Sequence, residues 1–292
     1  MWLHTLSATQ ALSICLMTKH NQQFIETVME YYRAHGRDYL PWRKTSNPYQ
    51  IAVSEIMLQQ TQVERVVPKY QDFVRQFPTT KQLAEASLAE VLTAWQGLGY
   101  NRRAKNLKHC AEVVHSEYRG RWPTTYEALQ TVPGIGPYTA GAIMAFAYNQ
   151  AVPLIETNIR TVYLHRFFLH QVDVTDKHIL QSIAVHLKHL PACNVEAKTW
   201  YAALMDYGSY LKKVHGNPNR RSKSYTVQST FAGSDRQVRG AIVRALATSP
   251  LSKQKLSAAV PAASSQQFAV QLEKLMSEGL VEKVGRLYQL PA

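Results

Sequence analysis

The chain has 292 residues, with 33 lysines and arginines against 20 acidic residues and a formal net charge of +13 at pH 7. A hydrophobic fraction of 46 % excludes a disordered polymer, and the length allows one large domain or two smaller ones with a real core. The positive charge favours a polyanionic partner, nucleic acid first, over a surface made basic only for solubility.

Residues 1–19 are mildly apolar, but no basic region precedes them and polar residues interrupt them. A signal peptide or membrane span is therefore not expected, and we interpret the segment as an N-terminal extension, with Met17 as an alternative start. The cysteines Cys15, Cys110 and Cys193 lie far apart and lack metal-ligand spacing. This favours a reducing, cytoplasmic location over a disulfide framework.

Apolar residues recur at helical spacing across residues 20–211 and predict an all-α domain. The Asn47-Pro48 pair predicts a helix start, and we expect Pro68 to divide the helical segment that follows. Residues 212–234 lose the periodicity and gain glycine, proline, serine and basic residues, which predicts a loop or linker.

Residues 235–292 have a different character, with three helical patterns followed by alternating apolar residues around Gly285. Three helices and a hairpin predict a small winged-helix-like module. A helical cap packed on the main domain is the alternative interpretation.

Glu55 lies in the segment AVSEIMLQQTQV and is the only charged residue from Gln50 to Gln62. A carboxyl group in apolar surroundings keeps its proton more readily and can act as a general acid near neutral pH. A surface or capping glutamate is the plainer alternative.

The segment VPGIGPYTAGAI places Gly134 and Gly136 in a turn between two helical patterns. This is the pattern of a helix-hairpin-helix, whose main-chain amides bind a DNA phosphate without reading sequence. In that fold a monovalent cation often bridges loop carbonyls and phosphate, so Gly134–Gly136 is a candidate cation site. A simple tight turn is the alternative.

Glu156, in the segment PLIETNIR, precedes a helix whose N-terminal amides would help to keep it ionised. One protonated acid and one ionised carboxylate form the pair that cleaves a glycosidic bond. In a nucleoside the leaving group is the base, which the acid protonates while the anion stabilises the cationic sugar. Glu156 could instead serve only as a helix-terminal carboxylate.

The segments PWRKTSNPYQIAVSEIMLQQTQVERVVPKY, GLGYNRRAKNL and VPGIGPYTAGAI closely resemble the MutY branch of the helix-hairpin-helix DNA glycosylases, and the resemblance covers about residues 22–210. It implies an all-α, two-lobed fold with a cleft between the lobes. It also implies a base-excision-repair enzyme that hydrolyses the glycosidic bond of adenine mispaired with 8-oxoguanine or guanine. Such an enzyme acts on double-stranded DNA as a monomer, in the cytoplasm near the nucleoid.

The resemblance assigns roles residue by residue. Glu55 matches the acid that protonates N7 of adenine, Glu156 the hairpin-side carboxylate, and Asn158 the asparagine that follows it. Tyr138 stands where bifunctional lyases have a lysine, so we expect a monofunctional glycosylase. Further expected contacts to the extruded base, the duplex or the phosphates come from Arg43, Gln59, Gln60, Tyr100, Gly134, Gly136 and Thr139.

Three departures from the family pattern stand out. Glu156 replaces the usual aspartate, and one more methylene moves the carboxylate by about 1.5 Å, a misplacement that can cost about a hundredfold in rate. Residues 205–225 contain no cysteine, so no iron–sulfur cluster is expected. The tail is too short for the Nudix-like domain that reads 8-oxoguanine in the family.

Basic residues occupy the loop in place of the cluster cysteines, and we expect them to contact phosphates: Lys212, Lys213, Arg220, Arg221 and Lys223.

Other functions stay open at this point. The same chemistry could act on thymine or uracil opposite guanine, or on an alkylated purine. A DNA-structure-binding protein without activity, or a transcription regulator built on the tail, would be a different class of function.

Overall fold

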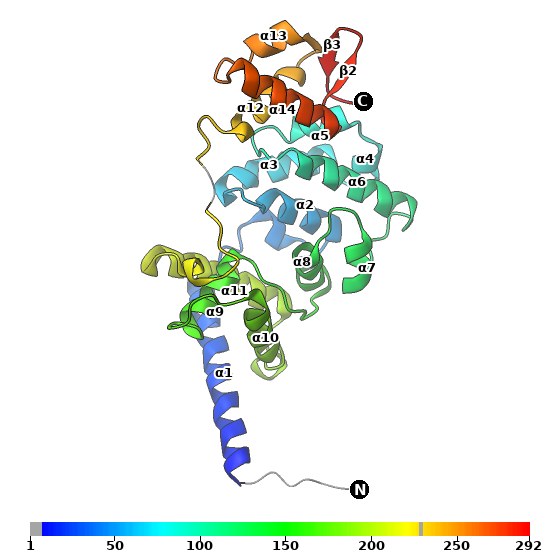
Figure 1. The fold of residues 1–292 in the computed structure, drawn as a ribbon. Helices are drawn as coiled ribbons and strands as arrows, with labels where there is room; N and C mark the ends of the chain where they lie inside the picture. Colours follow the sequence, from blue (N-terminus) through cyan, green and yellow to red (C-terminus); the bar gives the residue numbers. More distant parts are fainter. Residues whose placement is uncertain (1–7, 228–229) are drawn as a thin grey trace. The chain divides into compact units, whose positions relative to one another are not determined.

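The structure is a computed structural model in which residues 8–227 and 230–292 are described, with side chains from residue 19 onward. The described residues are mainly helical, with three short strands near the C-terminus (Figure 1). None of the described helices is both long and apolar enough to cross a membrane. The expected N-terminal extension lies partly outside the described residues, and its remaining part, from Ala8, belongs to the first helix.

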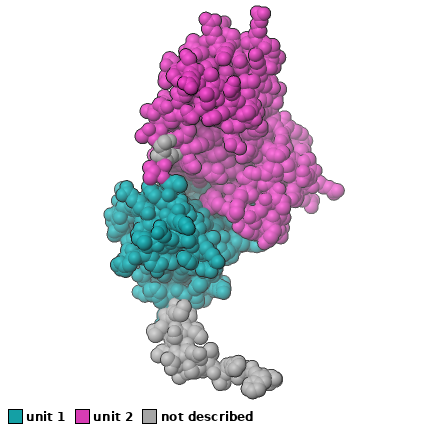
Figure 2. Space-filling view, viewed as in Figure 1, with its two compact units in different colours: residues 1–44, 141–226 teal, residues 45–140, 227–292 magenta. Residues whose placement is uncertain are grey.

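The chain divides into two compact units (Figure 2), residues 1–44 with 141–226 and residues 45–140 with 227–292. The first unit holds α1 (Ala8–His35), η1 (Pro41–Lys44), α9 (Thr157–Arg166), α10 (Asp176–Leu187), η2 (Pro191–Cys193), α11 (Ala197–His215) and η3 (Pro218–Arg221). The second holds α2 (Pro48–Leu58), α3 (Val63–Gln76), α4 (Thr80–Glu85), α5 (Leu88–Ala94), α6 (Arg102–Ser116), α7 (Tyr126–Thr131), α12 (Asp235–Leu246), β1 (Leu251–Ser252), α13 (Lys253–Ala258), α14 (Ser265–Ser277), β2 (Glu282–Val284) and β3 (Leu287–Gln289). The boundary at residues 140 and 141 falls inside α8 (Pro137–Tyr148).

The core of the first unit is aromatic. Phe24 of α1 packs edge-on against Tyr163 of α9 at 5.8 Å between ring centroids, against Trp200 of α11 at 5.7 Å and against His186 of α10 at 4.8 Å. Edge-to-face pairs of this kind add to the free energy gained by burying the rings. This cluster holds α9, and with it the residues at the start of α9, against the rest of the unit.

The helix starts of the second unit follow from local sequence. Asn47 caps α2 by accepting hydrogen bonds from the N–H groups of Tyr49 and Gln50, with Pro48 as the first helical residue, as the sequence predicts. The expected division at Pro68 is wrong. The helix break lies at residues 59–62, where Gln60 takes a left-handed conformation with φ 54°, and Pro68 lies inside α3.

Packing explains why α3 keeps its proline. A proline inside a helix loses one main-chain hydrogen bond. The strongly amphipathic α3 nevertheless buries Val66, Tyr70 and Phe73 on one face, so the tertiary contacts of the helix outweigh that loss.

Residues 235–292 contain the expected three helices and hairpin, and Gly285 turns the hairpin with φ 61°. A third strand, β1, which the sequence pattern did not indicate, completes an antiparallel sheet of order β1-β3-β2. Leu251 pairs with Tyr288, and Val284 pairs with Leu287. Three helices and this sheet are the elements that a winged-helix-like module requires, and the assignment of residues 235–292 as such a module stays a prediction.

The C-terminal module, defined as residues 235–292, packs within the second unit. The N–H of Ala89 donates to the carbonyl of Pro291 at 2.9 Å, and Lys105 Nζ donates to the carbonyl of Glu278 at 2.5 Å. Main-chain and side-chain hydrogen bonds thus attach the module to α5 and α6.

Candidate active site and DNA-binding surface

Glu55 lies on α2 with its side chain inside the second unit, only 4 % exposed. Its helix neighbours Ser54 and Ile56 are buried as well. The hydroxyl of Tyr138, in the first turn of α8, donates to Oε2 of Glu55 at 2.5 Å. The structure thus brings together two candidate catalytic residues that are 83 positions apart in sequence.

This pairing fixes the orientation of the acid. Burial favours a neutral carboxyl group, whereas a hydroxyl donor stabilises negative charge on the oxygen that accepts it. A proton transferred by Glu55 would therefore leave from Oε1, and the hydrogen bond of Tyr138 would stabilise the carboxylate that remains.

The hairpin joins α7 to α8. Gly134 has φ 81°, a conformation that favours glycine, and a Cβ there would also make a tight contact of 3.2 Å with Cβ of Asn106 of α6. A Cβ on Gly136 would meet no atom within 4 Å, so an anion can approach the turn from that side. The main-chain N–H groups at a helix start can bind such an anion, and α8 starts directly after this glycine.

Thr139 is buried, with 2 % of its surface exposed. The expected contact of Thr139 with DNA therefore stays a prediction. The candidate cation site at Gly134–Gly136 stays a prediction.

Glu156 caps helix α9 in the first unit. Its Oε1 accepts hydrogen bonds from the N–H groups of Asn158 and Ile159, both at 2.7 Å, and its Oε2 accepts a longer one from Asn158 Nδ2 at 3.4 Å. Burial raises the pKa of Glu156 above its usual value, although these N–H donors and the charges of Lys212 and Arg160 lower it. The expectation of an ionised Glu156 therefore depends on those opposing groups.

Two glycines set the position of Glu156. A Cβ on Gly208 of α11 would lie 2.1 Å from the carbonyl oxygen of Asn158, and a Cβ on Gly141 of α8 would lie 2.9 Å from Cβ of Leu154. Only glycine permits these approaches. Leu154, before α9, is thus held close to α8, and the first turn of α9 close to α11.

Arg43 forms a buried ion pair inside the first unit. Its guanidinium donates to both carboxylate oxygens of Asp206 at 2.6 and 2.8 Å and to the carbonyl of Ala202 at 3.3 Å. Arg37 Nε also donates to Asp206, at 2.7 Å. Burial alone would raise the pKa of Asp206, but the hydrogen bonds and charges of Arg43 and Arg37 outweigh it and hold that pKa below its usual value. A contact of Arg43 with an extruded base stays a prediction.

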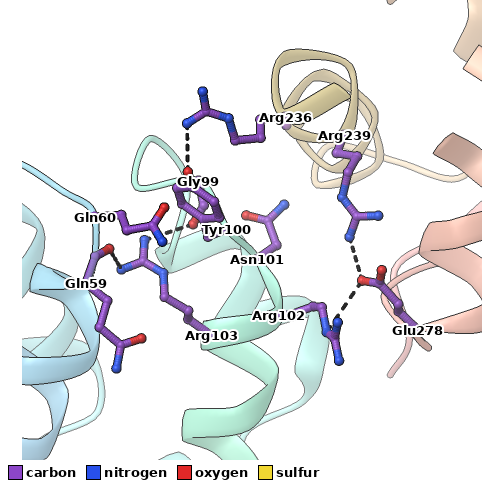
Figure 3. A pocket seen from close by; sticks show the side chains of 11 residues that line it. Gln59, Gln60, Gly99, Tyr100, Asn101, Arg102, Arg103, Arg236, Arg239 and Glu278 are labelled. Atoms are coloured by element: carbon purple, nitrogen blue, oxygen red, sulfur yellow. Dashed lines mark hydrogen bonds and ion pairs between the residues drawn. The ribbon is translucent and has the colours of Figure 1, made fainter. Parts of the chain in front are cut away.

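Gln59, Gln60 and Tyr100 line a pocket of about 410 Å³ in the second unit (Figure 3). Gln60 and Tyr100 both have left-handed backbone conformations, with φ 54° and 49°. Such conformations are uncommon for residues other than glycine and cluster at ligand-binding sites. The structure thus places Gln59 and Tyr100, which were expected to enter the duplex, beside Gln60, which was expected near the extruded base.

The basic loop is anchored on α9. Arg221 donates to the carbonyls of Leu164 at 2.9 Å, of Phe168 at 2.6 Å and of Leu169. Asn219 Nδ2 donates to the hydroxyl of Thr161 at 2.8 Å. The guanidinium of Arg221 therefore has a structural role. A contact of Arg221 with a phosphate would have to replace some of these hydrogen bonds.

The other basic residues of the loop differ in exposure. Lys213, Arg220 and Lys223 are exposed, whereas Lys212 is half-buried and lowers the pKa of Glu156 by its charge. Phosphate contacts therefore remain a proposal mainly for Lys213, Arg220 and Lys223.

The cysteines of the described residues do not fit the ligand requirement of an iron–sulfur cluster. Within the described part of the chain, no three His, Cys, Asp or Glu side chains gather in the way a metal ion requires. Cys110 is buried in α6 and Cys193 lies in η2, and residues 205–225 contain no cysteine. Cluster ligation requires several thiolates at one place, which these two separated cysteines do not provide.

Two important residues escaped the sequence interpretation. Asp206 is a buried charge within an apolar helical pattern, which is a usable signal because buried acids need partners. Arg103 donates to the main-chain carbonyls of Ile56 at 2.7 Å, Met57 at 2.9 Å and Gln59 at 2.6 Å. Because Arg103 lies among other basic residues in the sequence, the pattern did not distinguish it from a DNA-contacting residue.

Comparison with known proteins agrees with this geometry. The profile described as HhH-GPD superfamily base excision DNA repair protein matches residues 53–188, which include Glu55, Tyr138 and Glu156. The adenine DNA glycosylase of Mycolicibacterium smegmatis is 36 % identical over 267 residues, which cover 85 % of this chain and 89 % of that protein. The adenine DNA glycosylase of Mycobacterium tuberculosis is 36 % identical over 281 residues, which cover 88 % and 89 %.

A solved structure adds to the comparison. That of a thermostable thymine-DNA glycosylase aligns with a TM-score of 0.58 and 25 % sequence identity, covering 66 % of this chain and 88 % of that one. The helix-hairpin-helix glycosylase fold expected from the sequence is thereby confirmed.

Proposed function

Because this chain belongs to the HhH-GPD superfamily of base excision DNA repair proteins, we propose that it is an adenine DNA glycosylase that hydrolyses the N-glycosidic bond of adenine opposite 8-oxoguanine or guanine. The relatives named adenine DNA glycosylases match it over most of its own length and theirs. The observation that carries the proposal is the buried Glu55 held by the Tyr138 hydroxyl at 2.5 Å.

In this mechanism Glu55 is the general acid. It donates a proton to a ring nitrogen of the adenine, so the base leaves as a neutral group while the C1′–N bond breaks. The resulting carboxylate accepts the proton of the attacking water, and the Tyr138 hydroxyl stabilises the negative charge between these steps. General acid–base catalysis of this kind contributes roughly 10²–10⁴-fold in rate.

Glu156 has the second role. As the bond breaks, positive charge develops on the sugar, and an anionic carboxylate stabilises it electrostatically. The two N–H donors at 2.7 Å hold the carboxylate in one orientation, which supports this role.

We infer that the enzyme is monofunctional. A lyase that forms a Schiff base needs an amine at the sugar, and Tyr138 offers a phenol that is already hydrogen-bonded to Glu55. We also infer that the chain works without an iron–sulfur cluster, because residues 205–225 contain no cysteine and the basic loop instead fastens α9 through Arg221 and Asn219.

A second candidate function is excision of thymine or uracil opposite guanine. The likeness to a thymine-DNA glycosylase structure, with a TM-score of 0.58, favours it over excision of an alkylated purine. A binding protein without activity has no use for a buried acid held by a hydroxyl, so the pairing of Glu55 with Tyr138 speaks against it.

Single-turnover excision separates these functions. Duplexes with adenine opposite 8-oxoguanine or guanine are incubated beside T:G and U:G duplexes, and strand breaks are developed with alkali. Breaks at adenine support the proposal. Breaks at T:G or U:G alone would instead support the second candidate function. Borohydride trapping of a protein–DNA adduct would contradict the monofunctional assignment.

A further inference from the structure

One face of α11 packs along α9 in the first unit (Figure 1). Gly208 of α11 lies so close to α9 that a Cβ there would be 2.1 Å from the carbonyl oxygen of Asn158. Further along, the ring of His215 stacks on that of His165 with 4.8 Å between centroids. Positions 208 and 215 are nearly two turns apart, so they share one face of the helix. Lys212 lies between them on this face, about one turn after Gly208.

The direction of the two helices brings Lys212 toward the start of α9. The earlier residue of α9 contacts the earlier residue of α11 and the later contacts the later, so the helices run in the same direction. Side chains of a helix lean toward its N-terminus. Such a lean brings the ammonium group of Lys212 toward the level of Asn158. Glu156 is the N-cap of α9, directly before this level.

The ionised form of Glu156 depends on nearby donors and positive charge. Burial has the largest effect on its pKa and raises it, while the main-chain N–H groups of Asn158 and Ile159 lower it. The charges of Lys212 and Arg160 also lower the pKa. The N–H groups donate to Oε1 at 2.7 Å, whereas the bond that Oε2 accepts from Asn158 Nδ2 is longer, at 3.4 Å. The local donors thus stabilise one oxygen of the carboxylate more than the other.

Lys212 and Arg160 differ in how far other acids offset their charge. Arg160 donates to both oxygens of Asp176 at 3.0 and 2.9 Å, so that carboxylate offsets its charge. Among the residues that the structure describes, Lys212 forms no such ion pair. Its half-buried position also reduces screening of its charge by salt. Lys212 is therefore the cation of the first unit best placed to act on Glu156.

We propose that Lys212 is a positioning residue for excision, whose ammonium charge keeps the Glu156 carboxylate anionic as positive charge develops on the sugar. An anion at that point stabilises the sugar cation electrostatically. Two departures of the sequence then belong together: Glu156 in place of aspartate, and Lys212 as the first basic residue of a segment without cysteines. This inference rests on the proposed function, which gives Glu156 its role.

Titration of Glu156 in the free, full-length protein tests the inference without any excision step. The protein is labelled with ¹³C at the glutamate carboxyl carbons, and the Glu156 resonance is identified by its absence from Glu156→Gln. Lys212→Met keeps the length of the side chain without its charge. Because a nearby positive charge favours the carboxylate, the midpoint of Glu156 should move to higher pH in this variant. Lys212→Arg keeps the charge and should leave the midpoint close to that of the wild type.

Two further variants make the result specific. Lys198→Met removes a positive charge from the N-terminal end of the same helix, about 21 Å away along its axis, and should leave the midpoint unchanged. Lys198 is exposed and forms an ion pair with Glu196 at 3.1 Å. Lys212→Gln repeats the neutral substitution with a polar side chain, so the test still works if methionine disturbs the packing of α11 on α9.

The pH profile of single-turnover excision connects this charge to the reaction. A rate that needs an anionic Glu156 and a protonated Glu55 rises and then falls with pH. Lys212→Met should move only the rising limb to higher pH. Excision at the acidic end should then be about tenfold slower, the effect of one pH unit, with the falling limb in place. His165 and His215 are present in every variant compared, so they affect all the profiles alike.

Several outcomes would overturn the inference. A Glu156 midpoint that is the same in the wild type and in both neutral variants would show that Lys212 does not keep the carboxylate ionised. An equal shift in Lys198→Met would make the effect one of net charge. A rate that falls by the same factor at every pH would assign Lys212 to folding or to the phosphates. Absence of adenine excision by the wild type, with a midpoint that depends on Lys212, would reject the proposed function alone.

Discussion

The hydroxyl of Tyr138 donates a hydrogen bond to Oε2 of Glu55 across 2.5 Å, joining the first turn of α8 to the middle of α2. The oxygen that accepts this bond carries no proton, so in the proposed mechanism the acid would donate its proton from the other oxygen. In the proposed mechanism Tyr138 orients the acid, and its lack of an amine supports the proposal of a monofunctional enzyme.

The first prediction concerns removal of the Tyr138 hydroxyl. Tyr138→Phe keeps the ring and loses the donor, so the carboxylate formed after proton transfer is less stable. A hydrogen bond to a charged group contributes about 1.5–3 kcal/mol, so single-turnover excision should slow by about ten- to a hundredfold with folding unchanged. Excision at the wild-type rate would show that Tyr138 has no part in the chemistry.

The close approach of α9 to α11 gives the second prediction. Gly208→Ala places a Cβ only 2.1 Å from the carbonyl oxygen of Asn158, so it must push the start of α9 aside. A displacement of about 1 Å at Glu156 should slow excision by about a hundredfold. Ser209→Ala, the exposed neighbour on the same helix, is the control and should leave the rate unchanged.

An alanine variant at position 208 that excises adenine at the wild-type rate would mean that the position of Glu156 does not limit catalysis.

The third prediction concerns pH. Asp206 has a lowered pKa because Arg43 and Arg37 outweigh the effect of burial, so its ion pairs stabilise the fold above the unfolded pKa of about 3.9. That stability is lost as the pH falls through the lower folded pKa. Asp206→Asn should cost about 3 kcal/mol at pH 7 because two arginines lose their carboxylate.

Urea unfolding from pH 7 to pH 3 measures this effect. The difference in unfolding free energy between wild type and Asp206→Asn should stay constant down to about pH 4 and shrink below it. A difference that grows on acidification would contradict the assignment.

The basic loop gives the fourth prediction. Arg221→Ala removes hydrogen bonds to three carbonyls at the end of α9, so the free energy of unfolding should fall by about 2 kcal/mol. Arg220→Ala changes an exposed neighbour and should alter stability by less than about 0.5 kcal/mol.

DNA binding separates the two arginines further. If Arg220 contacts a phosphate, Arg220→Ala should weaken binding to all duplexes alike and reduce the salt slope by about one. Equal losses of stability in both variants would contradict the division of roles within the loop.

Local motifs carried most of what the sequence could predict. The helix cap at Asn47, the Gly134 turn and the acid Glu55 each depend on a few neighbouring residues, so they are visible in a short window. Pro68 misled the helix assignment because the tertiary packing of α3 outweighs a lost hydrogen bond.

Long-range pairings were beyond the sequence pattern. Arg43 forms an ion pair with Asp206, 163 positions away in the sequence. Tyr100 accepts a hydrogen bond from Arg236, 136 positions away. Each partner is an ordinary polar residue in its own segment. Only the fold shows that Arg43 is an internal ion-pair residue and that the C-terminal module reaches the pocket beside Tyr100.

The role of Glu55 as the acid is tested by single-turnover excision from an A:8-oxoguanine duplex, with the wild type and Glu55→Gln compared after alkali development. Glutamine keeps the size of the side chain and an oxygen for Tyr138 but cannot donate an acidic proton. We predict adenine release by the wild type and a loss of at least about a hundredfold in the variant, with DNA binding retained. Equal release by both proteins would contradict the assignment of Glu55 as the acid.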